Sequence, residues 1–184
     1  MVIRGALVTL RPAREGDRRA IYQWLAESDL TPSMTGPPHF PDVPAPTWDE
    51  FCDDYESFFF DGTRQEVGRS FLIEVQGEAV GHINYDGMDS ARGLAELDIW
   101  LRAKAFCGHG YGSDALVALT RYIQETFGVT EFIIRPSGRN QRAIRAYAKA
   151  GFATLPLTDE QQAELYGPGD YSDTVVMFKK LPAS

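Results

Sequence analysis

The sequence predicts a domain of the α/β or α+β class, in which helices cover the faces of a mixed central sheet of about six to seven strands. Short runs that alternate like strands are interspersed with longer runs of helical periodicity along the chain. With 184 residues, 43% of them hydrophobic, the chain is long enough to bury one substantial core. We therefore expect a single domain over residues 1–184.

The first part of the chain opens with an expected strand over residues 2–10 and an expected helix over residues 14–28. Six of the eleven prolines then lie between Thr31 and Thr47. Proline fixes φ and removes an N–H donor, so this segment is predicted to be a loop and neither helix nor central strand. A loop of this length is often functional.

A second helix is expected over residues 48–60, because Thr47-Trp48-Asp49-Glu50 is a capping-box pattern that starts a helix. The aromatic side chains of this helix are interpreted as core residues: Phe51, Tyr55, Phe58 and Phe59. Two strands follow over residues 70–75 and 79–85, joined by the tight turn Gln76-Gly77-Glu78.

The second half of the chain is predicted to alternate strands and helices. The expected elements are a loop over residues 87–93, a strand over 94–101, a helix over 113–127, a strand that ends at Pro136, a helix after Asn140, a strand to about Pro156, a helix with Thr158 as N-cap and Gly167 as terminator, and a final strand over 173–180. The strand over 94–101 leads into a glycine-rich turn, around which the other elements are organised.

This turn is Cys107-Gly108-His109-Gly110-Tyr111-Gly112, and the helix follows it at once. Glycines at alternate positions let the backbone approach a ligand with its N–H groups turned outward. The start of a helix adds unpaired N–H donors and the positive end of the helix dipole, which together favour a phosphate. Gly112-Ser113-Asp114 lacks the lysine of a P-loop, and the glycine spacing does not fit a dinucleotide fold. A tight strand-to-helix connection without a ligand is the remaining alternative.

A second motif lies downstream, where a helix opened by Asn140 ends in Tyr147-Ala148-Lys149-Ala150-Gly151-Phe152. Together with the glycine turn it resembles the GNAT superfamily of acetyl-CoA-dependent N-acetyltransferases, whose signature joins a Gln/Arg-x-x-Gly-x-Gly/Ala turn to a later Asn…Tyr-x-x-x-Gly-Phe segment. The stretch also resembles the aminoglycoside 6′-N-acetyltransferase branch and the branch that acetylates ribosomal proteins. Cys107 stands at the usual Gln/Arg position, which we expect to weaken one contact without abolishing the site, because backbone N–H groups bind most of the phosphate.

The resemblance implies a fold, a cosubstrate and a set of binding residues. The fold is the GNAT fold, in which the fourth and fifth strands splay apart into a V-shaped cleft. The cosubstrate is acetyl-CoA, and the implied binding residues are Trp100, Leu101, Arg102, Cys107, Gly108, His109, Gly110, Tyr111, Gly112, Ser113, Asn140, Ala143 and Tyr147. For four basic residues near the second motif a solvated face is favoured over contact with a CoA phosphate: Arg139, Arg142, Arg145 and Lys149.

The chemistry is predicted on the strand before the turn. Side chains alternate along a strand, so Glu96, Asp98 and Trp100 share one face. The GNAT resemblance implies that an acid of this strand is the general base for the acceptor amine, with Asp98 ahead of Glu96. An ordinary solvated strand face is the alternative.

The remaining catalytic roles follow from the same resemblance. Tyr147 matches the family's general acid for the departing thiolate, with core packing as the alternative. Backbone N–H groups near residues 100–102 are predicted to hold the oxyanion. A covalent route through Cys107 is discounted, since the family transfers the acetyl group directly.

The net charge of −8 argues against a nucleic-acid partner. Between Glu27 and Glu66 there are ten acidic residues and a single base, Arg64, which indicates either a cationic acceptor or solubility and helix-start chemistry. The predicted acceptor is a primary amine of the cationic aminoglycoside kind. A protein N-terminus, a siderophore-pathway hydroxylamine and a non-catalytic acyl-CoA-binding module are the alternatives.

No signal-peptide pattern is seen at the N-terminus, and no apolar run approaches the roughly 20 residues that span a membrane. A cytoplasmic monomer or homodimer without a membrane partner is therefore expected. Cys52 and Cys107 give no disulfide framework, and His39 and His82 lack the spacing of metal ligands, so no metal is predicted.

Overall fold

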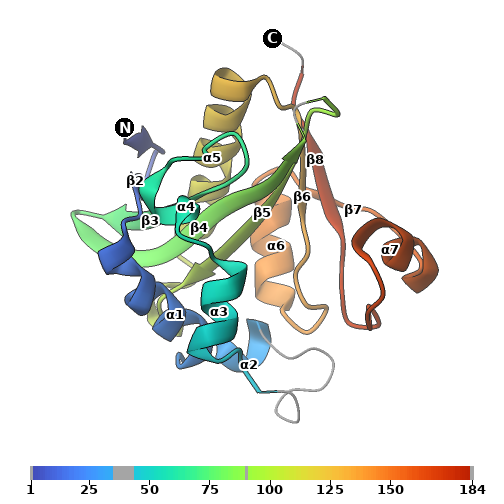
Figure 1. Cartoon of the computed structure of the whole chain (residues 1–184), viewed down its shortest axis with the longest axis horizontal. Coiled ribbons are helices and arrows are strands. Elements are labelled where there is room, and N and C mark those ends of the chain that lie inside the picture. Colours follow the sequence, from blue (N-terminus) through green and yellow to red (C-terminus); the bar gives the residue numbers. More distant parts are fainter. Residues whose placement is uncertain (1, 35–43, 90, 183–184) are drawn as a thin grey trace.

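The computed structural model describes residues 2–34, 44–89 and 91–182. Within them lies one mixed eight-stranded sheet with the order β1-β2-β3-β4-β5-β6-β8-β7 (Figure 1). The strands are β1 (Ile3–Arg4), β2 (Thr9–Pro12), β3 (Arg69–Val75), β4 (Glu78–Asp89), β5 (Leu94–Leu101), β6 (Glu131–Ile134), β7 (Ala153–Thr154) and β8 (Met177–Lys180). The helices are α1 (Arg18–Ala26), α2 (Thr31–Met34), α3 (Trp48–Asp54), α4 (Phe58–Asp61), α5 (Tyr111–Phe127), α6 (Gln141–Lys149) and α7 (Asp159–Tyr166).

Strands β5 and β6 separate along their length. β5 pairs with β6 in parallel only from Leu94↔Glu131 to Glu96↔Ile133, and it continues to Leu101 beyond the last pair. On its other side β6 pairs with β8. Figure 1 shows β4 and β5 diverging from β6 and β8, with α6 in the opening between them. The predicted splay of the strands that are here β5 and β6 is confirmed.

Helices cover both faces of the sheet, as predicted (Figure 1). On one face, Leu116 and Leu119 of α5 belong to the same buried cluster as Leu97 of β5. On the other face, Trp100 of β5 packs with Ile21 of α1 in a second cluster. Alternate residues of β5 thus serve opposite layers, as the geometry of a strand requires.

The opening segment is a hairpin, so the prediction of one strand over residues 2–10 is wrong. β1 and β2 pair antiparallel, with Ile3 opposite Leu10. The chain turns between them because the carboxylate of Asp114 accepts the backbone N–H groups of residues 6–8. This anchor lies in a distant part of the sequence, where local alternation does not reveal it.

The helix predicted over residues 48–60 is two helices, α3 and α4. Its capping box forms as predicted, with the side chain of Thr47 accepting the N–H of Glu50. Tyr55 then leaves the helical conformation, with φ −106° and ψ 73°. Its hydroxyl donates to Asp98 on β5, so a contact with the sheet overrides the local helical pattern.

The proline-rich segment contains one helical turn, α2, within the predicted loop. Pro32 lies in this first turn, where its missing N–H leaves no helical bond unmade. Residues 35–43 of the predicted loop, including His39, lie outside the described residues. Among the helices that the structure describes, none has the length and apolar character to cross a membrane.

Two strand boundaries also differ from the prediction. β4 runs on to Asp89, into the predicted loop over residues 87–93, because it continues to pair with β5 through a register irregularity. β8 begins only at Met177. Before it, Asp173 is drawn away from regular pairing by a hydrogen bond from Ser137.

Candidate active site

A cavity of about 370 Å³ lies where β5 parts from β6. Its walls include Leu101 of β5, Gly112 of α5 and Tyr147 of α6. Leu30 and Met34 add an apolar wall from the α2 region. The splay of the sheet therefore creates the room for a ligand between the strands and α6.

The glycine turn and the first turn of α5 form one wall of this cavity. Gly108 and Gly110 have φ values of +84° and +85°, in the left-handed region that favours glycine. Gly110 is the N-cap of α5, and the N–H groups of residues 111–113 have no partner within the helix by its geometry. These donors and the helix dipole suit a phosphate or pyrophosphate.

Two side-chain contacts hold the α5 and α6 walls. The hydroxyl of Ser113 donates to the carbonyl of Ala146 at 2.8 Å, which joins the two helices. The side chain of Asn140 accepts the N–H of Ala143 at 3.1 Å, so the predicted N-cap of α6 is confirmed. Both contacts involve residues that line the cavity: the first fixes the separation of α5 and α6, and the second fixes the start of α6.

The cavity gathers most of the residues predicted to bind the cosubstrate. Those that line it are Trp100, Leu101, Cys107, Gly108, Gly110, Tyr111, Gly112, Ser113, Asn140, Ala143 and Tyr147. The structure does not bring Arg102 and His109 to it. The guanidinium of Arg102 pairs with Glu78 at 2.6 Å, and Nε2 of His109 lies 3.2 Å from the carbonyl oxygen of Ala105. Each side chain is held by a local partner instead.

Basic side chains of α6 also face the cavity. Arg142, Arg145 and Lys149 line its wall, and Arg145 and Lys149 are also exposed to solvent, so contact of this helix face with a CoA phosphate stays a prediction. Arg139, which precedes the helix, instead pairs with Asp173 at 2.9 Å. The cavity therefore combines main-chain donors at the turn with positive side chains on α6, an arrangement suited to a ligand with several phosphates.

Asp98 lies on β5 just before the residues that line the cavity. Its Oδ1 accepts the N–H of Ile99 at 2.8 Å, and its Oδ2 accepts the hydroxyl of Tyr55 at 3.2 Å. The side chain is open to solvent, but protein surrounds it on most sides, and this burial raises the pKa of Asp98 to about 6. Such a carboxylate is ionised at neutral pH and is basic enough to assist deprotonation of an amine.

Glu96, the other predicted base, is already paired. Its Oε1 accepts from Nε of Arg135 at 2.5 Å. The Arg135 guanidinium in turn lies 4.1 Å from the ring centroid of Tyr166. Because this ion pair occupies Glu96, the geometry favours Asp98 for the role of base.

Three residues of the site were not predicted: Tyr55, Asn84 and Asp86. In the β4–β5 ladder Asn84 lies opposite Asp98, and Asp86 lies opposite Glu96, so these four side chains share one face of the sheet. Burial, followed by the charges of Glu96 and Asp98, raises the pKa of Asp86 to about 7. Asn84 is fully buried, and its side-chain amide has no hydrogen-bond partner within the described part of the chain.

The sequence carries a signal for two of these three residues. His82, Asn84 and Asp86 alternate with apolar residues, which indicates a polar face on this strand. Tyr55 gives no such signal, because it stands at helical spacing from Phe51 and resembles a core residue. Its ring does stack on Phe51, at 4.7 Å between centroids, while its hydroxyl reaches the site.

Tyr147 faces the cavity from α6 and is buried, with 8% of its surface exposed. Burial, and then the charge of Asp98, raise its pKa above the ordinary value of a phenol. Tyr147 therefore stays protonated at neutral pH. A protonated phenol that lines the cavity is in a position to donate a proton to a leaving thiolate, although the raised pKa makes it a weaker acid than free tyrosine.

The backbone of β5 offers one N–H group on its open side. The N–H of Arg102 donates to the carbonyl of Val80 at 2.8 Å, and Trp100 is paired with His82 in the same ladder. Hydrogen bonds on one side of a strand alternate along it, so the N–H of Leu101 points away from β4. Within the predicted region 100–102, Leu101 is thus the residue whose N–H can face a ligand.

Cys107 lies in the cavity wall, where burial outweighs the nearby positive charge of Arg142. Burial raises the pKa of its thiol, and its Sγ lies 3.8 Å from the carbonyl oxygen of Ala103. A thiol with a raised pKa is a poor nucleophile at neutral pH. In the ranges that the structure describes, no three His, Cys, Asp or Glu residues are grouped so as to hold a metal ion.

The splayed sheet, the glycine turn and the acid–phenol pair agree with one family of transferases. A model of the acetyltransferase (GNAT) domain matches residues 8–153, which is most of the chain. The chain belongs to the GNAT acetyltransferase family.

Individual relatives and solved structures show which acetyltransferases the chain is similar to. An aminoglycoside N(6′)-acetyltransferase type 1 from Klebsiella pneumoniae is 28% identical over 155 residues, which cover 79% of this chain and 73% of the relative. The structure of RimL, a ribosomal L7/L12 α-N-protein acetyltransferase solved with coenzyme A, has a TM-score of 0.75 at 20% identity and covers 100% of both chains. The structure of spermidine N-acetyltransferase from Vibrio cholerae with CoA and spermine has a TM-score of 0.70 at 20% identity, and it covers 95% of this chain and 96% of that one.

Proposed function

We propose that this acetyltransferase moves the acetyl group of acetyl-CoA to a primary amine of a small acceptor that carries further positive charge. The main-chain N–H groups of residues 111–113 would hold the pyrophosphate of the donor. The side chains of Arg142, Arg145 and Lys149 would bind the other negatively charged phosphate oxygens of the donor. The apolar wall of Leu30 and Met34 suits the uncharged arm of the same molecule.

The row of acids on β4 and β5 carries the proposal for the acceptor. Glu96 and Asp98 both raise the pKa of Asp86, so the three carboxylates repel one another. Arg135 pairs with Glu96 and offsets only part of this charge. A cationic acceptor relieves the repulsion, whereas a neutral one leaves it in place.

Groups of the chain itself account for both proton transfers. Acetyl-CoA supplies an acetyl thioester that is activated towards amines. Asp98 takes the proton that the acceptor nitrogen loses as the C–N bond forms. Tyr147 gives a proton to the sulfur as the C–S bond breaks, so that the products are an amide and a thiol. The N–H of Leu101 donates to the carbonyl oxygen while its negative charge grows.

The names of the relatives support this acceptor class. One relative acts on aminoglycosides, and a solved structure of similar fold contains spermine, both of which are compounds with several amino groups. A non-catalytic acyl-CoA-binding module is disfavoured, because such a module has no need of a base and an acid around one space. The charge of Asp98 raises the pKa of Tyr147, which supports a shared catalytic role for the two residues.

A single domain over residues 1–184 is part of the proposal. β8 lies beyond the residues that match the family model, but it pairs with β6 in the same sheet. A cytoplasmic location and a monomeric or homodimeric state stay predictions from the sequence.

Steady-state release of CoA thiol with a panel of acceptors tests the function. The panel holds a linear polyamine, an aminoglycoside, a peptide with a free N-terminus, a hydroxylamine and a monoamine. We expect kcat/KM for the polyamine or the aminoglycoside to exceed that for the monoamine by about 100-fold, the effect of one or two charge-assisted contacts. Equal rates with the monoamine would contradict the acceptor class, and no turnover with any amine would contradict the transferase activity.

A further inference from the structure

Asp114 lies in the first turn of α5, directly behind the glycine turn, and binds the tip of the N-terminal hairpin. Its Oδ1 accepts the N–H of Ala6 at 2.9 Å, and its Oδ2 accepts the N–H groups of Leu7 and Val8 at 2.7 and 2.9 Å. Its own N–H donates to the carbonyl of Gly110 at 3.0 Å. One residue therefore joins the hairpin to the turn.

The hairpin fits closely against this carboxylate and against the turn. A Cβ atom at Gly5 would lie 2.3 Å from Oδ2 of Asp114, so only glycine leaves the carboxylate where it is. A Cβ atom at Gly110 would lie 3.2 Å from Cδ1 of Leu7, which shows that the hairpin tip packs on the turn itself. The Leu7 side chain is 54% exposed, so burial in the core does not account for its position.

The negative charge of Asp114 has to be balanced by hydrogen-bond donors such as the N–H groups of the hairpin. A carboxylate in the first turn of a helix stabilises the helix dipole, but it also repels an anion that binds at the same end. The three N–H groups of the hairpin draw this charge away from the anion site. The carboxylate can then anchor the turn with little penalty for a bound phosphate.

We propose that Asp114 is a positioning residue for the donor, which locks the glycine turn against the β1–β2 hairpin and so sets the affinity for acetyl-CoA. The inference rests on the proposed role of the turn as the pyrophosphate site. Gly108 and Gly110 give this segment the conformational freedom that a ligand must remove on binding. An anchor outside the cavity lowers that entropic cost without touching the reacting atoms.

Asp114→Asn tests the anchor from the helix side. The amide keeps the size of the carboxylate, but its NH₂ group faces backbone donors, so at least one hydrogen bond is lost. The KM for acetyl-CoA and the Kd for CoA should rise about tenfold, while kcat and the KM for the amine change less than about twofold. Gly5→Ala displaces the same carboxylate from the hairpin side and should give the same split between KM and kcat.

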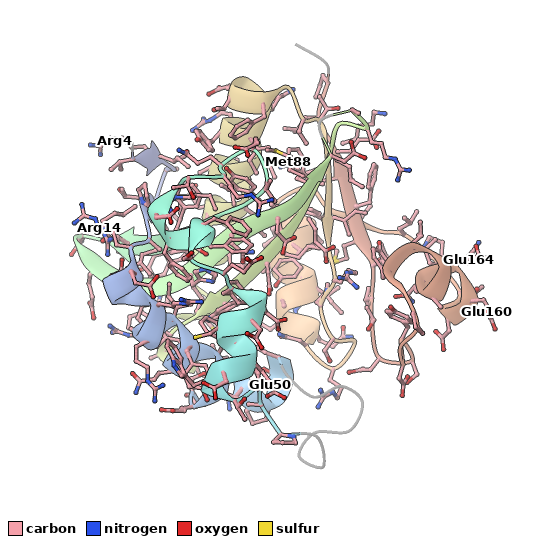
Figure 2. The ribbon with its side chains drawn as sticks, viewed as in Figure 1. Arg4, Arg14, Glu50, Met88, Glu160 and Glu164 are labelled. Atoms are coloured by element: carbon pink, nitrogen blue, oxygen red, sulfur yellow. The ribbon has the colours of Figure 1, made fainter. Side chains whose placement is uncertain are left out.

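Arg121→Met is the matched control. Arg121 donates to the carbonyl of Arg4 at 2.9 Å, so it joins the same hairpin to α5 about two helical turns beyond Asp114. Figure 2 labels Arg4 on β1. This variant should lower the melting temperature but leave the KM for acetyl-CoA unchanged.

Three outcomes separate the possibilities. Unchanged CoA affinity in Gly5→Ala, or in a folded Asp114→Asn protein, would overturn the role of Asp114. An equal rise of KM in Arg121→Met would overturn it as well, since any loosening of the hairpin would then suffice. If the wild-type protein does not bind CoA, the proposed function fails, and the role of Asp114 fails with it.

Discussion

The proposed donor site and the proposed acceptor site of this protein are built in opposite ways. The proposed donor site centres on the main-chain N–H groups of one continuous segment, residues 111–113, which the helix start orients, and α6 adds basic side chains around them. The acceptor site uses side chains from three separate elements, namely Tyr55 after α3, Asp86 on β4 and Asp98 on β5. Main-chain N–H groups bind an anion whatever the side chains of the segment are. Charged side chains, in contrast, select a substrate of complementary charge.

This difference explains why an unusual residue at Cys107 is compatible with an otherwise regular turn. It also means that the two sites can be perturbed independently. Changes to the acids should alter the acceptor parameters and the chemical step, and they should leave the affinity for CoA intact. The predictions below test this separation, beginning with the largest expected effect.

Tyr147→Phe should have the largest effect, because it removes a proton donor while keeping the ring that packs against the core. We expect kcat to fall by about 10² to 10⁴, the usual contribution of a general acid. The Kd for CoA should stay within about twofold of the wild-type value, as for an interaction made only in the transition state. Both quantities are measured by steady-state kinetics and calorimetry, and an unchanged kcat would show that Tyr147 is structural.

Asp98→Asn should lower kcat/KM by about 10² to 10³. The wild-type rate should rise with pH through the pKa of Asp98, which is about 6, because only the ionised carboxylate accepts a proton. The variant lacks this carboxylate, so its deficit should be small below pH 6, where Asp98 of the wild type is protonated, and greatest above that pH. The deficit should shrink again at high pH, where the acceptor amine is already deprotonated in solution. A pH–rate profile checks this, and a limb near pH 6 that survives in the variant would exclude Asp98 as the base.

Asp86→Asn should raise the KM for a polyamine about tenfold, since one charged contact is lost, with little change in kcat. The pKa of Asp86 is raised to about 7, so the wild-type acceptor site gains negative charge as the pH rises through that value. The affinity for a polycation should therefore increase with pH in the wild type and be flatter in the variant. A monoamine of equal length is the control. An equal rise of its KM would mean that Asp86 does not interact with the additional positive charge of the polyamine.

Tyr55→Phe should have the smallest effect and should act through Asp98. The hydroxyl of Tyr55 stabilises the ionised carboxylate and so lowers the pKa of Asp98, against the stronger effect of burial. Without it the pKa rises, and the acid limb of the pH–rate profile should move to higher pH by less than about one unit. At high pH the rate should match the wild type. A limb that stays in place or moves to lower pH would contradict the role assigned to Tyr55.

The same contrast explains what could be predicted from the sequence. The donor site depends on neighbours in the chain: Gly108 and Gly110 supply the left-handed turn, and Asn140 caps the helix that begins beside it. Local rules of this kind apply before any tertiary contact is known. The strand over residues 94–101 was predictable for the same reason and has the bounds that its pattern indicates.

The acceptor site depends on contacts between distant segments. Asp86 joins it because pairing with Glu96 extends β4 past the predicted end of that strand at Tyr85. Tyr55 joins it because a hydrogen bond to Asp98 draws it out of a helical pattern. The contact of Tyr55 is tertiary and could not be predicted from the residues around it. The alternation of His82, Asn84 and Asp86 indicates a polar strand face, but it does not indicate that Glu96 and Asp98 lie opposite that face.

Calorimetric titration of CoA into two variants tests the separation of the sites most directly. Gly110→Asp places a side chain and a negative charge at φ +85° beside the phosphate site, and the Kd should rise at least about 100-fold. The double variant Asp86→Asn/Asp98→Asn should bind CoA within about twofold of the wild type, because the donor site uses none of these carboxylates. Melting curves confirm that both variants are folded. CoA affinity that survives in Gly110→Asp, or that is lost in the double variant, would contradict the account.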